Sequence, residues 1–398
     1  MTEVADPRRL VHSPTSTGRR ALMVAASAGL IVLVLMGLRV AMVCDGAIGC
    51  PVVAGDLFTR PELVDIPVVD GAGYDGQFFY RQAQEPFRFE REQRSGVAFD
   101  NSIRPGRVGY PAAAWILSGG GQAVAVPVAL LGVGILSMAG VAGLLAAAAA
   151  RSGRSPWWGL AGAAIPGLLF ATGRDLADPF SALTAGATAF ALTSRRWGLA
   201  TVCSVAAVMT KEQAIVIPIA YGMSRVWHWL EARRFTPGAA DLPWIVPALV
   251  FAAWQGVLFA TTGELAVASA GGAHIVAPGT ELLPAVLRWV TPELTSVGAT
   301  ELIWLVELLT VVALAVIVVR STTSSRWERI VAVLTMVLLL VLNSNVWVDP
   351  AHFRQVGDFM VVMMLAAFRS PLRRWFDALL AANASVGIVI ALRALTVL

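Results

Sequence analysis

Residues 21–43 read ALMVAASAGLIVLVLMGLRVAMV, a long apolar run. Its length matches the roughly 20 apolar residues that an α-helix needs to cross the hydrocarbon core of a bilayer. The run is too long for the core of a signal peptide and lacks a clear cleavage site, so we expect it to remain as a first membrane helix. The polar residues 1–20 contain four arginines and are expected to form a disordered tail.

The rest of the chain continues this apolar character. Of its 398 residues, 57% are hydrophobic and 14% are charged, and the mean hydropathy is +0.70. Soluble domains average about 45–50% apolar and 25% charged residues, so a water-soluble fold could not bury this much apolar surface. The composition predicts an all-α polytopic membrane protein. The net charge is only +4, and no basic run is interleaved with aromatic residues, which argues against nucleic-acid binding.

Further apolar runs predict about eleven spans in a single transmembrane domain over residues 21–398. They lie near 122–150, 156–173, 179–194, 197–210, 213–230, 243–261, 299–319, 328–345, 356–368 and 376–396. The pair 197–210 and 213–230 is short for about 30 Å of hydrocarbon, so one long helix there, and ten spans in all, is the alternative. Two long outer loops, 44–107 and 262–298, interrupt the series, and the second contains an amphipathic stretch from Glu281 to Trp289.

Basic residues are distributed unevenly between the predicted loops. With the N-terminus inside, every inner loop carries at least two basic residues, whereas the short outer connections carry at most one. This is the positive-inside bias, and removing one span would invert it for the rest of the chain. We therefore expect a multi-pass protein of the cell membrane with a cytoplasmic N-terminus. Cys44 and Cys50 would then lie on the exported side, where they could form a disulfide.

The remaining ionisable residues fall mostly on the predicted outer side, in loops or at the outer ends of short helices. They are Asp70, Asp75, Arg104, Arg107, Arg174, Asp175, Asp178, Lys211, Glu212, His352 and Arg354. An unpaired charge at bilayer depth costs about 2.5–3.5 kcal/mol on insertion scales. These side chains must therefore pair with one another, face a wet cavity, or both.

Several of these residues also have simpler explanations. Arg174 and Asp178 are four residues apart and could pair on one helical face, and Asp178 before Pro179 is typical of a helix N-cap. Lys211, the only lysine in the chain, could pair with the adjacent Glu212 and hold a helical turn. The functional alternative is that Arg174 projects toward a ligand anion, and that Lys211 and Glu212 line a polar cavity.

The most distinctive string of the first outer loop is DGAGYDGQFFYR, residues 70–81. Glycines on both sides of Asp75 let the backbone turn tightly and approach a ligand. The aromatic residues 78–80 suit a helix that anchors the loop at the membrane interface. A second string, RPGRVGYP over residues 104–111, leads into the next membrane segment. An ordinary solvated loop is the alternative interpretation.

These strings resemble the first outer loop of the C-type glycosyltransferases (GT-C), polytopic enzymes that take a sugar from a polyprenyl-phosphate carrier. The closest likeness is to mannosyltransferase-like members. The stretch AVMTKE, residues 207–212, is similar to that family's polar break between membrane helices, and HFR, residues 352–354, to its late outer-loop cation. The likeness covers hydropathy over most of the chain but specific residues in a few short patches. Many members have a paired acidic motif, whereas Asp70 and Asp75 are five apart here, so either could be the catalytic one.

The resemblance implies an enzyme that moves a sugar from a polyprenyl-phosphate donor to a cell-envelope glycan, lipid or protein on the outer side, with inversion. Asp75 is the candidate base, and Asp70 is the second candidate. The residues expected to bind the donor and its phosphate are Arg104, Arg107, Tyr110, Arg174, Asp178, Lys211, Glu212, His352 and Arg354. Arginine suits a phosphate because it makes bidentate, charge-assisted hydrogen bonds. A lipid phosphate is already a good leaving group, so a metal is not obligatory and no cofactor is expected.

Two other functions remain compatible with the sequence. A transporter or lipid flippase of the same helical class needs charges near the midplane or broken helices in matching halves, whereas the charges here are skewed outward. A non-catalytic membrane scaffold would use only the polar first loop to bind partners. Other catalytic signatures, such as a phosphate-binding loop, G-x-S-x-G or H-E-x-x-H, do not occur in the sequence.

Overall fold

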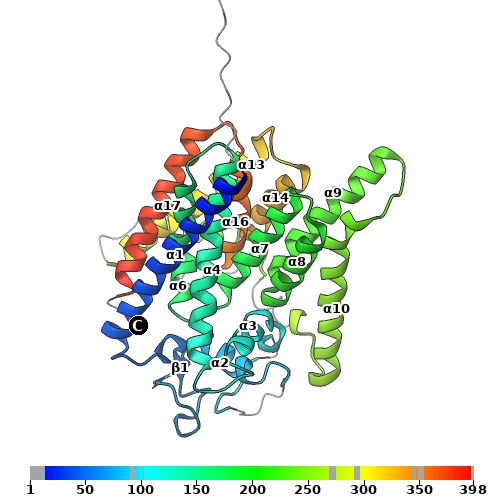
Figure 1. Ribbon diagram of the computed structural model, residues 1–398. Helices are drawn as coiled ribbons and strands as arrows, with labels where there is room; N and C mark the ends of the chain where they lie inside the picture. The colour runs from blue at the N-terminus through cyan, green and yellow to red at the C-terminus, as the bar shows by residue number, and fades with distance from the viewer. Residues whose placement is uncertain are drawn as a thin grey trace, which may run out of the picture.

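The computed structural model describes residues 14–89, 95–101, 103–268, 275–290, 296–342, 347 and 354–395. In this part of the chain the fold is all-α, apart from two strands of two residues each, β1 (Ala54–Gly55) and β2 (Val68–Val69), which pair in parallel. The long helices run side by side in one bundle, and the first outer loop is folded against one end of it (Figure 1).

Ten of the eleven predicted spans contain one principal helix. These helices are α1 (Pro14–Val43), α4 (Val126–Arg151), α7 (Asp178–Thr193), α8 (Trp197–Thr210), α9 (Val216–Ala232), α10 (Leu242–Thr262), α13 (Ser296–Arg320), α14 (Arg326–Val341), α16 (Gly357–Ala367) and α17 (Arg373–Arg393). The chain is also helical before Ala21, because α1 begins at Pro14. Residues 14–20 are therefore not part of a disordered tail, and residues 1–13 lie outside the described residues.

The run 156–173 is divided into three short helices, η4 (Pro156–Gly159), α5 (Leu160–Ala163) and α6 (Pro166–Thr172). Pro166 accounts for the break, because proline has no N–H and restricts the residue before it to an extended conformation. Ile165 is indeed extended, with φ −66° and ψ 117°. An apolar run of spanning length is thus not a single helix here.

Smaller helices occupy the loops between the long ones. They are η1 (Cys50–Val52), η2 (Pro61–Leu63), α2 (Gly76–Gln84), η3 (Arg104–Gly106), α3 (Gly109–Leu117), η5 (Glu212–Ile215), η6 (Ala239–Asp241) and α12 (Leu282–Val290). Helix α12 covers most of the amphipathic stretch of the second outer loop. The break between α8 and α9 is confirmed, because η5 separates the two helices.

Four helices of the described residues are long and apolar enough to cross a membrane, judged by length and composition: Thr17–Val43, Val126–Arg151, Ala239–Thr262 and Arg373–Arg393. The prediction of about eleven spans is therefore wrong. Helices α7, α8, α9, α14 and α16 have only 11 to 17 residues. At 1.5 Å per residue they fall short of the roughly 30 Å of a hydrocarbon core.

Helix α16 shows why hydropathy overestimated the number of spans. All eleven of its residues are buried, so it is apolar on every side because it lies in the centre of the bundle. A short run of this kind is typical of a core helix rather than of a membrane-crossing one. Its neighbours include α7, α13 and α14, and the main hydrophobic core lies between these helices.

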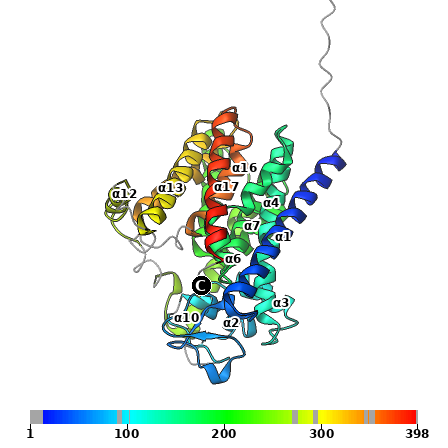
Figure 2. The same ribbon diagram turned by 90° about the vertical axis from the view of Figure 1, so that its left-hand side faces the viewer.

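The predicted inner loops contact one another at one end of the bundle. At one end, Arg154 after α4 pairs with Asp377 of α17 at 3.0 Å. Arg326 at the start of α14 pairs with Glu231 near the end of α9 at 2.9 Å. The predicted inner loops thus meet at the end that holds the start of α1, and the first outer loop lies at the opposite end (Figures 1 and 2).

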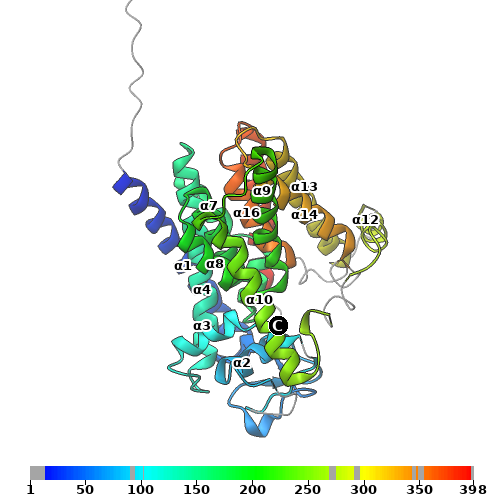
Figure 3. The ribbon, with the colours of Figure 1, turned by 90° about the vertical axis from the view of Figure 1, so that its right-hand side faces the viewer.

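The first outer loop is built around a second hydrophobic core. Phe78, Phe79 and Tyr80 of α2 are 3%, 2% and 1% exposed. The ring of Phe79 packs edge-on against Tyr110 of α3, with centroids 5.5 Å apart. The aromatic residues therefore anchor the loop inside the protein, and the prediction that they anchor it at a membrane interface is wrong. Helix α10 extends down beside this loop (Figure 3) and contacts η3.

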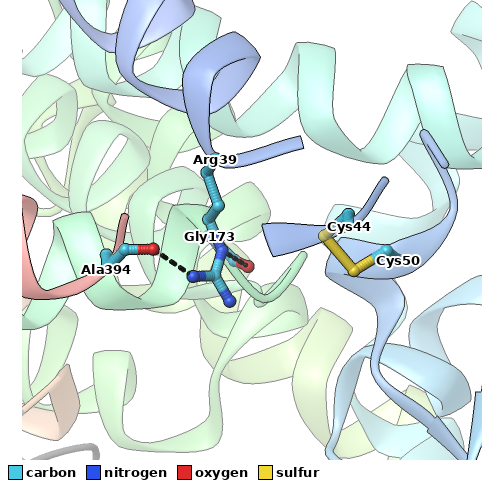
Figure 4. Close-up of a disulfide and its surroundings, with 5 residues drawn as sticks. All are labelled: Arg39, Cys44, Cys50, Gly173 and Ala394. Atoms are coloured by element: carbon cyan, nitrogen blue, oxygen red, sulfur yellow. Dashed lines mark hydrogen bonds between the residues drawn. A yellow bond between two sulfur atoms is a disulfide. The ribbon is translucent and has the colours of Figure 1, made fainter. Parts of the chain in front are cut away.

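A disulfide and two hydrogen bonds fix the outer end of α1. A disulfide joins Cys44 and Cys50, which confirms the pairing that the sequence allowed. Five residues before Cys44, the buried Arg39 donates hydrogen bonds to the carbonyl oxygens of Gly173 and Ala394 (Figure 4). These bonds tie α1 to the turn after α6 and to the end of α17, so the first outer loop starts from a fixed point.

Candidate functional site

Asp75 is held at the start of α2 by a turn that requires glycine. A Cβ atom at position 76 would lie 2.6 Å from the carbonyl oxygens of Val52 and Arg174, so only glycine fits there. Gly73 has a φ of +64° and pairs with Ala54 as an isolated β-bridge. The close approach of these backbones places the carboxylate of Asp75 at a defined position beside the bundle.

Asp75 forms two ion pairs with arginines from distant parts of the chain. One carboxylate oxygen is 2.8 Å from Nη1 of Arg104, and the other accepts a hydrogen bond of 2.9 Å from Nη2 of Arg354. Burial alone would raise the pKa of Asp75, but the two guanidinium groups outweigh this effect and hold that pKa well below its usual value. Asp75 is therefore a carboxylate in this arrangement.

Arg354 continues the network into the interior. Its Nη1 donates to Asp178 at 2.8 Å, and the other oxygen of Asp178 accepts from Lys211, also at 2.8 Å. Asp178 and Lys211 are 1% and 2% exposed. A buried chain of alternating charges thus runs from Asp75 through Arg354 and Asp178 to Lys211. Each charge is paired, as burial of a charge requires.

These contacts correct two local predictions. Asp178 is the first residue of α7, but Ala177 holds the N-cap position and no side chain caps the helix. The carboxylate of Asp178 instead pairs with Lys211 and Arg354, not with Arg174. Lys211 likewise does not pair with Glu212. Both local pairings predicted along the sequence are therefore wrong, and contacts between separate segments replace them.

Glu212 is paired with Arg107 across 105 residues of sequence. The pair is bidentate, with N–O distances of 2.9 and 2.6 Å. Burial opposes ionisation, but Arg107 lowers the pKa of Glu212 to about 2. Beside this pair, Gln213 donates to the backbone oxygen of Gln355 at 2.6 Å. The break between α8 and α9 is thus fastened both to the first outer loop and to the segment before α16.

Two acidic residues that we did not select from the sequence also belong to this region. Asp100 accepts two hydrogen bonds of 2.8 Å from Arg104, so Arg104 is shared between Asp75 and Asp100. Asp358 of α16 is 0% exposed and accepts a hydrogen bond of 2.6 Å from Ser181. The sequence did contain a signal for Asp358, because an acidic side chain inside an apolar run is costly to bury and marks a polar site.

A cavity of about 600 Å³ opens beside these ion pairs. Asp75, Arg104, Arg107, Glu212 and Arg354 line its charged part. Its apolar part includes side chains from α10, α14 and the segments around them, namely Phe251, Val267, Ile275, Leu338 and Leu342. One cavity therefore offers charged and apolar surface together, which suits an amphiphilic ligand.

Not every predicted site residue faces this cavity. Asp70 is exposed and is not among the lining residues. Tyr110 is buried in the second core, where its hydroxyl donates to the backbone oxygen of Leu130 at 3.0 Å. Arg174 lies over the rings of Phe170 and Tyr74, at 4.0 and 5.6 Å from their centroids. His352 lies outside the described residues.

The structure therefore brings together seven of the predicted site residues, which come from five separate segments. They are Asp75, Arg104, Arg107, Asp178, Lys211, Glu212 and Arg354. All four cations among them are already paired with carboxylates. An anion that enters the cavity can share an arginine with its carboxylate or displace that carboxylate, and displacement leaves the carboxylate more basic.

The polar groups near the cavity are suited to anions and to hydroxyl groups. Among the residues that the structure describes, no group of three or more histidine, cysteine, aspartate or glutamate side chains could hold a metal ion. Comparisons with protein families, with curated proteins and with solved structures give no match to this chain.

Proposed function

We propose that this chain is a membrane glycosyltransferase that transfers a sugar from a polyprenyl-phosphate donor to a cell-envelope acceptor. The observation that carries this proposal is the cavity in which Asp75, Arg104, Arg107 and Arg354 lie beside apolar residues of α10 and α14. A polyprenyl-phosphate sugar has a polar sugar, an anionic phosphate and an apolar tail. The charged and apolar parts of the cavity match these three components, in keeping with the resemblance of the first outer loop.

The proposed reaction takes place on the outer side of the cell membrane. Helices α1, α4, α10 and α17 would cross the bilayer, and the 25-residue α13 would return the chain to the cytoplasmic side before α17, with the arginine-rich loops in the cytoplasm as the positive-inside bias requires. The cavity lies toward the other end of the bundle, with the first outer loop. The Cys44–Cys50 disulfide at that end agrees with this orientation, because disulfides persist in oxidising compartments outside the cytoplasm.

Binding of the donor would begin with an exchange of ion pairs. The phosphate would draw Arg104 and Arg354 from Asp75, because a phosphate can accept the same bidentate hydrogen bonds as a carboxylate. Lys211 and Asp178 are buried behind Arg354 and would keep it positioned during the exchange. Loss of its two cationic partners raises the pKa of Asp75 toward the range in which a carboxylate works as a general base.

The transfer step then follows in one displacement. Asp75 takes the proton of the acceptor hydroxyl while the acceptor oxygen forms a bond to the anomeric carbon of the sugar. The bond between that carbon and the phosphate oxygen breaks, and the polyprenyl phosphate leaves with one more negative charge. Arg104, Arg107 and Arg354 stabilise the charge that develops on the phosphate. Attack from the face opposite the leaving group inverts the anomeric centre.

Transfer assays of two Asp75 variants test the proposal. Wild-type protein in proteoliposomes would be given a panel of labelled polyprenyl-phosphate sugars and envelope acceptors, and Asp75→Asn and Asp75→Ala would be compared with it. Loss of a general base lowers turnover by about 10²–10⁴-fold. Asp70→Asn is the matched control, because Asp70 is exposed and does not line the cavity. Wild-type turnover by both Asp75 variants would remove Asp75 from the mechanism.

One observation favours a second candidate function, a transporter or lipid flippase coupled to protons. Glu307 of α13 is 2% exposed, and neither of its carboxylate oxygens has a hydrogen-bond partner among the described residues. Acidic residues buried within helix bundles of membrane proteins often carry protons. If the chain is a transporter, Glu307→Gln should abolish uptake or lipid translocation in proteoliposomes. A glycosyltransferase should retain its transfer rate in the same variant.

A further inference from the structure

A second cavity lies near the arginine-rich end of the molecule, away from the Asp75 site. Its volume is about 510 Å³, and it lies between the start of α1 and the end of α4. The lining includes Thr17 and Arg20 of α1 and Arg154, Ser155 and Trp157 after α4. Both helices are long and apolar enough to cross a membrane. The cavity thus lies where two such helices end at the same face of the bundle (Figures 1 and 2).

The two arginines of this cavity differ in how firmly they are held. Arg154 pairs with Asp377 at 3.0 Å, donates to the backbone oxygen of Arg373 at 3.2 Å, and lies 5.1 Å from the ring centroid of Phe376. Arg20 is exposed and makes no ion pair with any residue that the structure describes. The side chain of Arg154 is therefore held in place beside the cavity, whereas the exposed side chain of Arg20 can turn toward a bound anion.

The other lining residues also match a ligand from a lipid surface. Thr17 and Ser155 add hydroxyl groups that can donate to phosphate oxygens. Trp157 is 52% exposed, and tryptophan is enriched at membrane–water interfaces. Met23 of α1, which also lines the cavity, is 51% exposed. Cationic, hydroxyl, aromatic and apolar groups thus follow one another from the cavity onto the side of α1.

We propose that this cavity binds the phosphodiester headgroup of an anionic phospholipid in the cytoplasmic leaflet. Arg20 and the two hydroxyl groups would hold the phosphate, and an acyl chain would lie along Met23. Basic pockets between transmembrane helices on the cytoplasmic side are suited to such headgroups. The inference rests on the membrane orientation proposed above. It does not depend on sugar transfer, because the two cavities share no lining residue.

Lipid retention in nanodiscs tests this assignment. Wild type, Arg20→Gln and Arg19→Gln would be purified and placed in phosphatidylcholine with or without phosphatidylglycerol, and bound lipid would be counted by native mass spectrometry. Arg20→Gln should retain about fivefold less phosphatidylglycerol, as expected for one basic residue near the membrane surface. Arg19→Gln is the matched control, because Arg19 is exposed, neighbours Arg20 and does not line the cavity. Arg20→Lys should restore much of the retention.

Three results would overturn the inference. The first is equal retention by wild type and Arg20→Gln. The second is an equal loss in Arg19→Gln, which would show only a general attraction between basic residues and anionic lipid. The third is displacement of the lipid by millimolar inorganic phosphate, which would identify free phosphate as the ligand. Unfolding temperatures in pure phosphatidylcholine confirm that each variant is folded, and no outcome depends on transferase activity.

Discussion

Arg354 donates a hydrogen bond of 2.9 Å to Asp75, a residue 279 positions earlier in the chain. The same guanidinium group donates to Asp178 at 2.8 Å, so one side chain joins the first outer loop, the start of α7 and the segment before α16. Its side chain is only 5% exposed, and both carboxylates depend on it for charge compensation. Arg354 is therefore the residue through which the site and the stability of the fold are connected.

Removal of this guanidinium group should destabilise the protein strongly. Arg354→Ala leaves Asp178 with Lys211 alone and Asp75 with Arg104 alone, and breaking a buried pair costs about 3–5 kcal/mol. Thermal unfolding in detergent would measure the loss. Arg326→Ala is the matched control, because Arg326 pairs with Glu231 at the surface, where an ion pair contributes little. Equal unfolding temperatures for wild type and Arg354→Ala would show that the buried chain of charges does not form.

The pair of Arg107 and Glu212 should make stability depend on acid pH. The pKa of Glu212 is lowered to about 2 in the folded protein, whereas a free glutamate has a pKa of about 4.3. A lowered pKa contributes stability that is fully present above the unfolded value and is lost as pH falls toward the folded value. Stability should therefore decrease between about pH 4.3 and pH 2.

Unfolding temperatures measured from pH 7 down to pH 3 would check this expectation. Glu212→Gln should be less stable than wild type at neutral pH, and its unfolding temperature should fall less steeply with acid. Asp377→Asn is a suitable control at the other end of the bundle, because its carboxylate is half exposed and remote from the cavity. Parallel pH curves for wild type and Glu212→Gln would contradict the assigned pair.

The positions of most helices could be predicted from the sequence, because they depend on local patterns. Apolar runs mark α1, α4, α10 and α17, and arginines mark the loops at one end. The number of membrane-crossing helices could not be predicted in the same way. A core helix such as α16 and a run broken at Pro166 are both apolar, so an apolar sequence alone does not distinguish them from a candidate span.

The membership of the site was predictable in part, but its pairing was not. Costly charges at outer helix ends indicated that Asp75, Lys211 and Arg354 belong together. Their partners depend on how α7 packs against α8 and α16, which no spacing along the chain reveals. For the same reason, spacing within the chain favoured the local partners Arg174 and Glu212 for Asp178 and Lys211, and both were wrong.

The disulfide should stabilise the loop that carries Asp75. Cys50 opens η1, and the chain continues to Val53, whose carbonyl oxygen accepts a hydrogen bond of 2.8 Å from the N–H of Tyr74. Cys44→Ser/Cys50→Ser should lower stability by about 2 kcal/mol, the value expected for a short closed loop. Limited proteolysis of the first outer loop and thermal unfolding would measure the effect. Cys203→Ser, which removes the free cysteine, is the control and should behave as wild type.

Gln77 should act as a positioning residue for Asp75. It is 1% exposed, its side-chain oxygen accepts from the N–H of Gly55 at 3.1 Å and from the hydroxyl of Thr59 at 2.9 Å, and its nitrogen donates to Ala72 at 2.7 Å. Gln77→Leu leaves these groups without a partner, at about 1–3 kcal/mol for each buried one.

The turn before Asp75 would then lose the three Gln77 hydrogen bonds but keep its backbone bonds to residues 53–57, and every ion pair of the site retains its own side chains. A general base that is displaced by about 1 Å lowers turnover up to about 100-fold, so kcat should fall more than KM rises. Thr59→Val is the matched control, because it removes only one of the three hydrogen bonds and should have a smaller effect on both quantities. If Gln77→Leu unfolds at a lower temperature but keeps its kcat, then Gln77 serves the fold alone and Asp75 is positioned by its arginines.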